Sequence, residues 1–159
     1  HLPGRRDDLF FLIIGYPVDD LASFIDENSL GPASLLTGRL EYEKLLAYLT
    51  LADLALEPKL ADSAEASGKT LHYMAAGLPV VCFDTENNRR FLADCGYYAR
   101  LGSDQSLAEA VLQALEDQER ARQKGNAGRE TVRQRFSMDR CRAFLLEHYS
   151  QLSKRGGRD

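Results

Sequence analysis

Short apolar runs alternate with helix-like segments along most of the chain, and this alternation constrains the fold more than any other feature. The apolar runs lie at residues 9–15, 33–37, 53–57, 79–83 and 96–99. The segments with helical patterning or caps lie at residues 19–28, 41–52, 67–77 and 88–94. Strands that alternate with helices predict a parallel sheet covered by helices on both faces. The expected fold class is therefore α/β with a Rossmann-like sheet.

The two patterns are clearest near the start of the chain. Leu9 to Gly15 is a continuous apolar run, which is typical of a strand buried on both faces. Residues 41–52 instead carry apolar side chains at the spacing of one helix face. These are Tyr42, Leu45, Leu46 and Leu49.

Three further helices are expected after the last strand. Ser106 to Glu109 has the Ser-x-x-Glu spacing of a capping box and would open the first of them. Residues 120–136 form a polar, surface-type helical segment, and Ser137 would cap a last helix to about residue 152. With no repeat and no internal linker, residues 1–159 are expected to form a single domain.

Composition excludes several classes of protein. The chain has 159 residues, 44% of them hydrophobic, and a net charge of −4, which argues against nucleic acid as the main partner. The longest apolar run is far shorter than the about 20 residues of a membrane helix. The three cysteines and three histidines show no metal-ligand spacing, so we expect no metal site. Cys82 fits a buried thiol, and a cytoplasmic location is expected.

Gly68-Lys69-Thr70 resembles the end of a phosphate-binding P-loop. That loop needs a second Gly five residues before the Gly-Lys pair, and this position holds Ser63. The loop should also leave a strand directly, whereas the preceding strand candidate ends near Glu57. A true P-loop is therefore not predicted.

A helix start at the same place is a second way to bind an anion. Ser67 is a good N-cap, Gly68 allows a ligand to approach the backbone, and the first amides of a helix lack acceptors within it. Ser67 alone would equally explain an ordinary capped helix. The expected position at the carboxyl end of a parallel sheet, where ligands bind in such folds, favours an anion site at Gly68 to Thr70.

Two side chains beside this helix start have two interpretations each. Glu65 is either a surface carboxylate that favours the helix dipole or an acceptor for hydroxyl groups of a ligand. His72, about one and a half turns into the helix, is either structural or in contact with the ligand.

Longer stretches resemble a known family. "GRLEYEKLLAYLTLADLALEP" and "EASGKTLHYMAAGLPVVCFDTENNRRFL" resemble the carboxyl-terminal domain of group 1, or family-four, glycosyltransferases of GT-B fold. "FFLIIGYP" matches the strand and Gly turn of that family, and "SMDRCRAFLLEHY" resembles its closing helix. The resemblance covers nearly the whole chain, and the order and spacing of these motifs make it specific.

The resemblance implies a domain that binds the donor, a nucleoside-diphosphate sugar, in a retaining sugar transferase. Gly15 would border the donor, and the segment Gly38-Arg39-Leu40 would border its nucleobase. The amides of Gly68 to Thr70, next to Ser67, would hold its diphosphate, and Lys69 would either add positive charge there or be a solvated lysine. Glu65 would hold the sugar hydroxyls, and the family usually has a ribose-binding Glu where this chain has His72. No divalent metal or other cofactor is implied.

The chain also departs from the family pattern. The two Glu residues of the family have seven residues between them, whereas Glu65 and His72 have six. Family members open this domain with a strand, a Lys and a helix that precede anything matched here. We therefore expect a fragment of a larger enzyme, inactive alone, whose amino-terminal acceptor domain could bring peripheral membrane association. The alternatives are a non-catalytic scaffold with a degenerate donor site and a related epimerase or phosphorylase domain.

Overall fold

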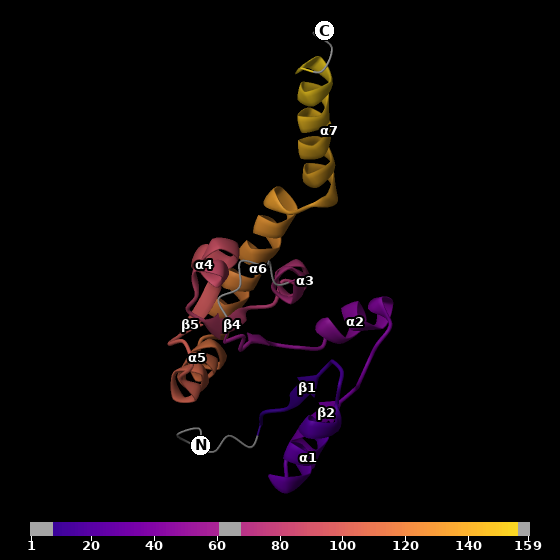
Figure 1. Ribbon diagram of the computed structural model, residues 1–159. Coiled ribbons are helices and arrows are strands. Elements are labelled where there is room, and N and C mark those ends of the chain that lie inside the picture. Colours follow the sequence, from indigo (N-terminus) through magenta and orange to yellow (C-terminus); the bar gives the residue numbers. More distant parts are fainter. Residues whose placement is uncertain (1–7, 61–67, 156–159) are drawn as a thin grey trace.

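The computed structural model describes residues 8–60 and 68–155, with side chains to residue 152. The strands are β1 (Phe11–Ile13), β2 (Ser34–Leu36), β3 (Ala55–Glu57), β4 (Val80–Phe83) and β5 (Gly96–Ala99). The helices are α1 (Asp19–Glu27), α2 (Tyr42–Leu49), α3 (Gly68–Ala76), α4 (Glu86–Leu92), α5 (Asp104–Glu116), α6 (Gln118–Arg135) and α7 (Met138–Arg155). Two short 3₁₀ turns, Gly31–Ala33 and Ala93–Cys95, precede β2 and β5 (Figure 1).

All the strand pairings are parallel, as the alternation of strands and helices predicts. The described strands form two sheets, one with the order β1-β2 and one with the order β3-β4-β5. The described residues therefore do not form a single continuous sheet. The expectation that residues 9–15 are buried on both faces is wrong, because Phe10 is 62% exposed and Phe11 is 40% exposed.

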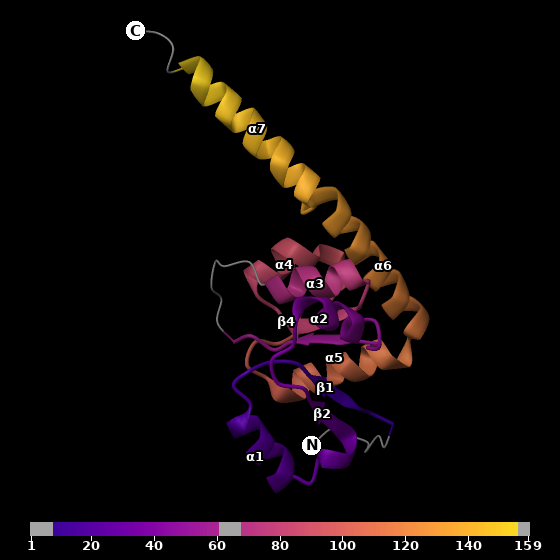
Figure 2. The same cartoon turned by 90° about the vertical axis from the view of Figure 1, so that its right-hand side faces the viewer.

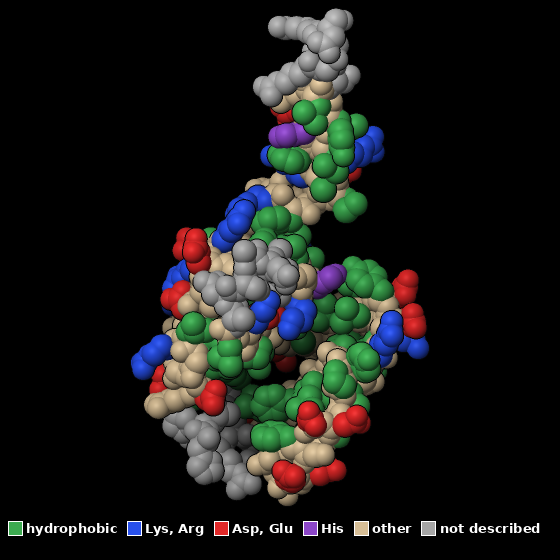
Figure 3. Space-filling model, viewed as in Figure 1, with side chains coloured by type: hydrophobic (Ala, Val, Ile, Leu, Met, Phe, Trp, Pro, Cys, Tyr) green, Lys and Arg blue, Asp and Glu red, His purple; other side chains and the backbone are tan. Residues whose placement is uncertain are grey.

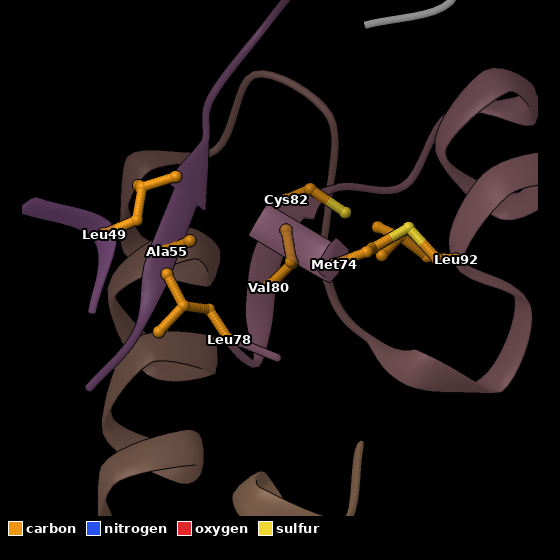
Figure 4. Packing of buried hydrophobic residues seen from close by; sticks show 7 residues of the cluster. All are labelled: Leu49, Ala55, Met74, Leu78, Val80, Cys82 and Leu92. Atoms are coloured by element: carbon orange, nitrogen blue, oxygen red, sulfur yellow. The ribbon is translucent and has the colours of Figure 1, made fainter. Parts of the chain in front are cut away.

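The three-stranded sheet holds most of the core. All four residues of β4 are buried, and their side chains alternate between two apolar clusters. Val80 and Cys82 pack with residues of α2, α3 and α4, and Figure 4 shows this cluster. Val81 and Phe83 pack on the opposite face with residues of α5 and α6. The predicted cover of helices on both faces is thus confirmed for this sheet. The prediction that the Cys82 thiol is buried is confirmed as well.

The helix α6 is more than the surface-type helix that its polar composition suggests. Its small residues Ala121, Gly125 and Gly128 are buried, and α6 packs closely on α3. A Cβ atom added to Gly125 would lie 2.1 Å from the carbonyl oxygen of Gly77. Glycine is therefore what allows the two backbones to approach so closely.

Two predicted helix starts are displaced in the structure. The prediction of a capping box that begins at Ser106 is wrong. Helix α5 begins at Asp104, and the Ser103 side chain caps it by accepting a hydrogen bond from Ser106 N. The Ser106 hydroxyl instead accepts a hydrogen bond from Arg100 N at 2.9 Å. The helix expected at residues 88–94 begins at Glu86, because the Thr85 side chain is the N-cap and accepts from Asn88 N.

The last helix projects from the rest of the molecule. Ser137 precedes α7 as expected, and α7 then extends away from both sheets (Figures 1 and 2). Hydrophobic side chains lie along its exposed surface (Figure 3), among them Met138, Leu145, Tyr149 and Leu152. Within the part of the chain that the structure describes, no helix is both long and apolar enough to cross a membrane.

Candidate donor-binding site

The carboxyl ends of β1 and β2 bring two predicted residues next to each other. Gly15 N donates a hydrogen bond to Gly38 O at 3.2 Å, which extends the strand pairing into the turn. Gly38 has a φ of 68°, a left-handed conformation that suits glycine and turns the chain toward α2. Arg39 is exposed and Leu40 half-buried just after this turn. These residues therefore lie at a sheet edge of the kind where ligands bind in α/β folds.

Among the residues that the structure describes, none crowds the start of α3, as an anion site requires. The helix begins at Gly68, and a Cβ atom added there would meet no described atom within 4 Å. The N–H groups of the first turn have no acceptors within a helix, and the dipole makes this end positive. A ligand could thus reach the backbone at Gly68. The predicted residues Glu65 and Ser67 lie outside the described residues.

Lys69 makes an ion pair that the sequence did not indicate. Its ammonium group lies 3.4 Å from Glu57 Oε2, and the two side chains are 65% and 1% exposed. Glu57 is the last residue of β3, so it lies at the carboxyl end of that strand. An acid at the end of an apolar strand, just before Pro58, is the signal that could have singled out Glu57.

The negative charge of Glu57 also acts on neighbouring ionisable groups. Burial, and after it the Glu57 carboxylate, raises the pKa of the Cys82 thiol to about 12. The same two causes raise the pKa of Tyr73. The neighbouring Thr70 is buried, and its hydroxyl has no hydrogen-bond partner among the described residues. A polar layer therefore lies beneath the first turn of α3.

His72 contacts a residue of α2. Its Nε2 atom lies 3.1 Å from the Tyr42 hydroxyl, and the two rings meet edge to face with centroids 5.6 Å apart. Tyr42 is 56% exposed and follows closely after Leu40. This pair links the segment after β2 to α3, so the structure brings the predicted residue His72 near the predicted segment at Arg39 and Leu40.

The end of β4 is occupied by a different ion pair. Arg89 of α4 donates two hydrogen bonds to Asp84, both at 2.7 Å, and its guanidinium lies 3.7 Å from the centre of the Tyr98 ring. The hydrogen bonds from Arg89 lower the pKa of Asp84. This arrangement holds α4 against the sheet and accounts for both charges without a ligand.

Neither a metal cluster nor the apolar cavity adds to the site. Among residues 8–60 and 68–155, no group of three or more His, Cys, Asp or Glu side chains is placed to hold a metal ion, so the expected absence of a metal stays a prediction. A cavity of about 200 Å³ lies between α1 and the sheet of β1 and β2. Its lining is apolar except for Ser34. We therefore interpret the cavity as loose packing and not as part of the site.

The parallel sheets, the covering helices and the open helix start together define a Rossmann-like α/β domain with a candidate anion site. The family model described as glycosyl transferases group 1 matches residues 2–117. The chain belongs to this family, as its sequence motifs indicate, and its fold is that of one half of a GT-B glycosyltransferase.

Solved structures share this fold at low sequence identity. Sucrose-phosphate synthase from Thermosynechococcus elongatus has 21% identity and a TM-score of 0.76, over 90% of this chain and 38% of that one. Anabaena HepE in complex with UDP-glucose has 17% identity and a TM-score of 0.81, over 92% and 42%. A glycosyltransferase from Rickettsia africae has 16% identity and a TM-score of 0.79, over 92% and 41%. The chain thus spans about two fifths of each.

None of the curated proteins compared with this chain gives a significant match.

Proposed function

We propose that this chain is the donor-binding domain of a retaining glycosyltransferase that uses a nucleoside-diphosphate sugar. One observation carries the proposal: the open start of α3 at Gly68, with the Lys69 cation beside it. Membership of the group 1 glycosyl transferase family supports it. The acceptor would bind to an amino-terminal domain of the same polypeptide, a proposal supported by the chain spanning only part of its structural neighbours.

In this proposal the diphosphate of the donor lies on the first turn of α3. Transfer breaks the bond between the sugar and the diphosphate, so negative charge grows on the leaving group. Preorganised amides and a cation stabilise such charge best where water is excluded. The amides of Gly68 to Thr70 and the Lys69 ammonium would do so, and no metal is needed for this account.

The remaining donor contacts are those that the family resemblance implies. Glu65 would accept hydrogen bonds from the sugar hydroxyls and orient the sugar, which contributes positioning and not nucleophilic attack. Gly15, Arg39 and Leu40 would border the nucleoside. His72, held by Tyr42, would contact the ribose hydroxyls in place of the carboxylate that the family usually has there.

Titration calorimetry with the 159-residue chain tests the proposal. UDP is the first probe, because HepE has been crystallised with UDP and with UDP-glucose. GDP, ADP and the corresponding nucleotide sugars complete the panel. Binding of at least one nucleotide is expected. A chain that stays folded and binds none of them would favour the scaffold alternative and exclude a working donor site in this chain.

A matched pair of variants locates the binding. Gly68→Asp places a carboxylate against the expected phosphates and should abolish binding through charge repulsion. Gly31→Asp is the control, because Gly31 is equally open and precedes β2, away from α3. If both variants bind the nucleotide as the unmodified chain does, the phosphates do not lie at Gly68.

A further inference from the structure

Glu57 is a carboxylate that the fold buries beside the proposed site. A carboxylate in the core is costly unless a cation and hydrogen bonds compensate it. Alternate residues of a strand face the same side, so Glu57 points to the same face of the sheet as Ala55, which packs in the cluster with Met74 of α3. The strand therefore aims this carboxylate toward α3 instead of toward open solvent.

Lys69 is placed where a cation is otherwise unfavourable. It is the second residue of α3, and the positive end of a helix dipole disfavours a cation in the first turn. Lysine also has a flexible stem, which costs entropy to hold in one position. The ion pair with Glu57 offsets both costs, while 65% of the Lys69 side chain stays exposed. The cation is thus anchored on one side and open to a ligand on the other.

We infer that Glu57 is a positioning residue that holds the Lys69 ammonium beside the first turn of α3, where Lys69 contacts the anionic group of the ligand. Glu57 itself does not touch the ligand. It fixes the direction of the cation, so that binding the anion requires no further ordering of the lysine side chain. The inference rests on the proposed function only in taking that anion to be the diphosphate of the donor.

The first experiment is a double-mutant cycle on UDP binding, measured by calorimetry. Lys69→Met keeps the length of the side chain and removes its charge, and we expect about tenfold weaker binding. Glu57→Gln should weaken binding by a similar factor through loss of the anchor. The double variant should bind no worse than Lys69→Met alone, because residues that act as one unit are not additive. Glu130→Gln, which breaks the exposed pair with Arg133, should change nothing.

A second measurement covers the case in which Glu57→Gln fails to fold. In the unmodified chain, UDP should protect Lys69 from acylation of its amino group at least several-fold. Lys44, exposed on α2, is the internal control and should react equally with and without UDP.

The outcomes separate this inference from the proposed function. If the unmodified chain binds UDP but Lys69 is not protected, or if a folded Glu57→Gln variant binds UDP as tightly as the unmodified chain, the inference is overturned and the donor site stands. Additive losses in the double variant would overturn it as well. If no nucleotide of the panel binds the unmodified chain, both are overturned together.

Discussion

The backbone of Gly125 in α6 lies directly against the carbonyl oxygen of Gly77 at the end of α3. Gly77 has a φ of 78° and ends the helix in the left-handed conformation that glycine commonly adopts at this position. Arg129 of the same α6 donates a hydrogen bond to Ala76 O at 2.6 Å. The position of α3, and with it the candidate site, thus depends on α6.

Gly125→Ala should therefore destabilise the domain. The added Cβ atom would lie 2.1 Å from a backbone oxygen, which cannot move without shifting α3. We expect a loss of about 3 kcal/mol in the free energy of unfolding, measured in urea. Gly128→Ala is the control, because its Cβ atom would meet Met74 at an ordinary 3.6 Å. That variant should be as stable as the unmodified chain or gain up to about 1 kcal/mol. Equal effects of the two substitutions would contradict this packing.

If the donor binds as proposed, His72→Glu should sharpen the recognition of its ribose. A carboxylate can accept hydrogen bonds from both hydroxyls of a ribose, whereas His72 is already engaged with Tyr42. We expect the ratio of UDP to 2′-deoxy-UDP affinity to rise about tenfold. Binding of the deoxy nucleotide should change little, which serves as the control. An unchanged ratio would place the ribose elsewhere.

Glu65→Gln tests the sugar contact of the proposed donor site. A neutral amide is a weaker acceptor for sugar hydroxyls, so affinity for a nucleotide sugar such as UDP-glucose should fall by about tenfold. Affinity for UDP itself should fall much less, because UDP carries no sugar beyond its ribose. Equal losses for the two ligands would assign Glu65 to the helix dipole and not to the sugar.

Ser103→Ala should cost about 1 kcal/mol of stability, because it removes the N-cap of α5. Ser103→Asp should restore most of that loss, since Asp is an equally good cap. Chemical denaturation of the three proteins measures the difference. A Ser103→Ala variant of unchanged stability would show that the cap contributes nothing.

The Cys82 thiol should make stability fall at alkaline pH. Its pKa is raised from 9.0 to about 12 in the folded protein, first by burial and then by Glu57 and Asp84. The unfolded chain therefore loses this proton first, and the contribution to stability is complete below pH 9 and lost progressively as the pH rises toward 12. Urea unfolding at pH 8 and pH 10 should show a larger loss for the unmodified chain than for Cys82→Ala. Equal losses would mean that the thiol ionises normally in the fold.

Much of the fold was predictable because local sequence patterns determine where most of the strands and helices lie. Val80 to Phe83 form an apolar run preceded by Gly77 and Pro79, which is typical of a buried strand. In the structure, β4 is buried on both faces. The run before Gly15 is just as apolar, yet β1 is partly exposed. An apolar run shows that a strand can be buried, while its actual burial depends on which helices cover the two faces of the sheet.

The elements that carry the candidate site were predictable in outline, but the contacts between their side chains were not. The helix start at Gly68 follows from local signals, but the contact of Lys69 with Glu57 depends on how α3 packs over β3. The contact of His72 with Tyr42 likewise depends on where α2 lies. In the same way, Ser103 and Ser106 both fit an N-cap locally. Gly102, with a φ of 72°, ends the turn directly before Ser103. Ser103 is therefore the N-cap, and α5 begins at Asp104.

The projecting helix α7 also has a mechanical consequence. Its 18 residues form a rod about 27 Å long, joined to α6 by the short break at Phe136 and Ser137. A rotation of about 10° at that joint moves the far end of α7 by about 5 Å, because a helix with a rise of about 1.5 Å per residue is long at 18 residues. Small changes in the angle between α6 and α7 are therefore amplified at Leu152.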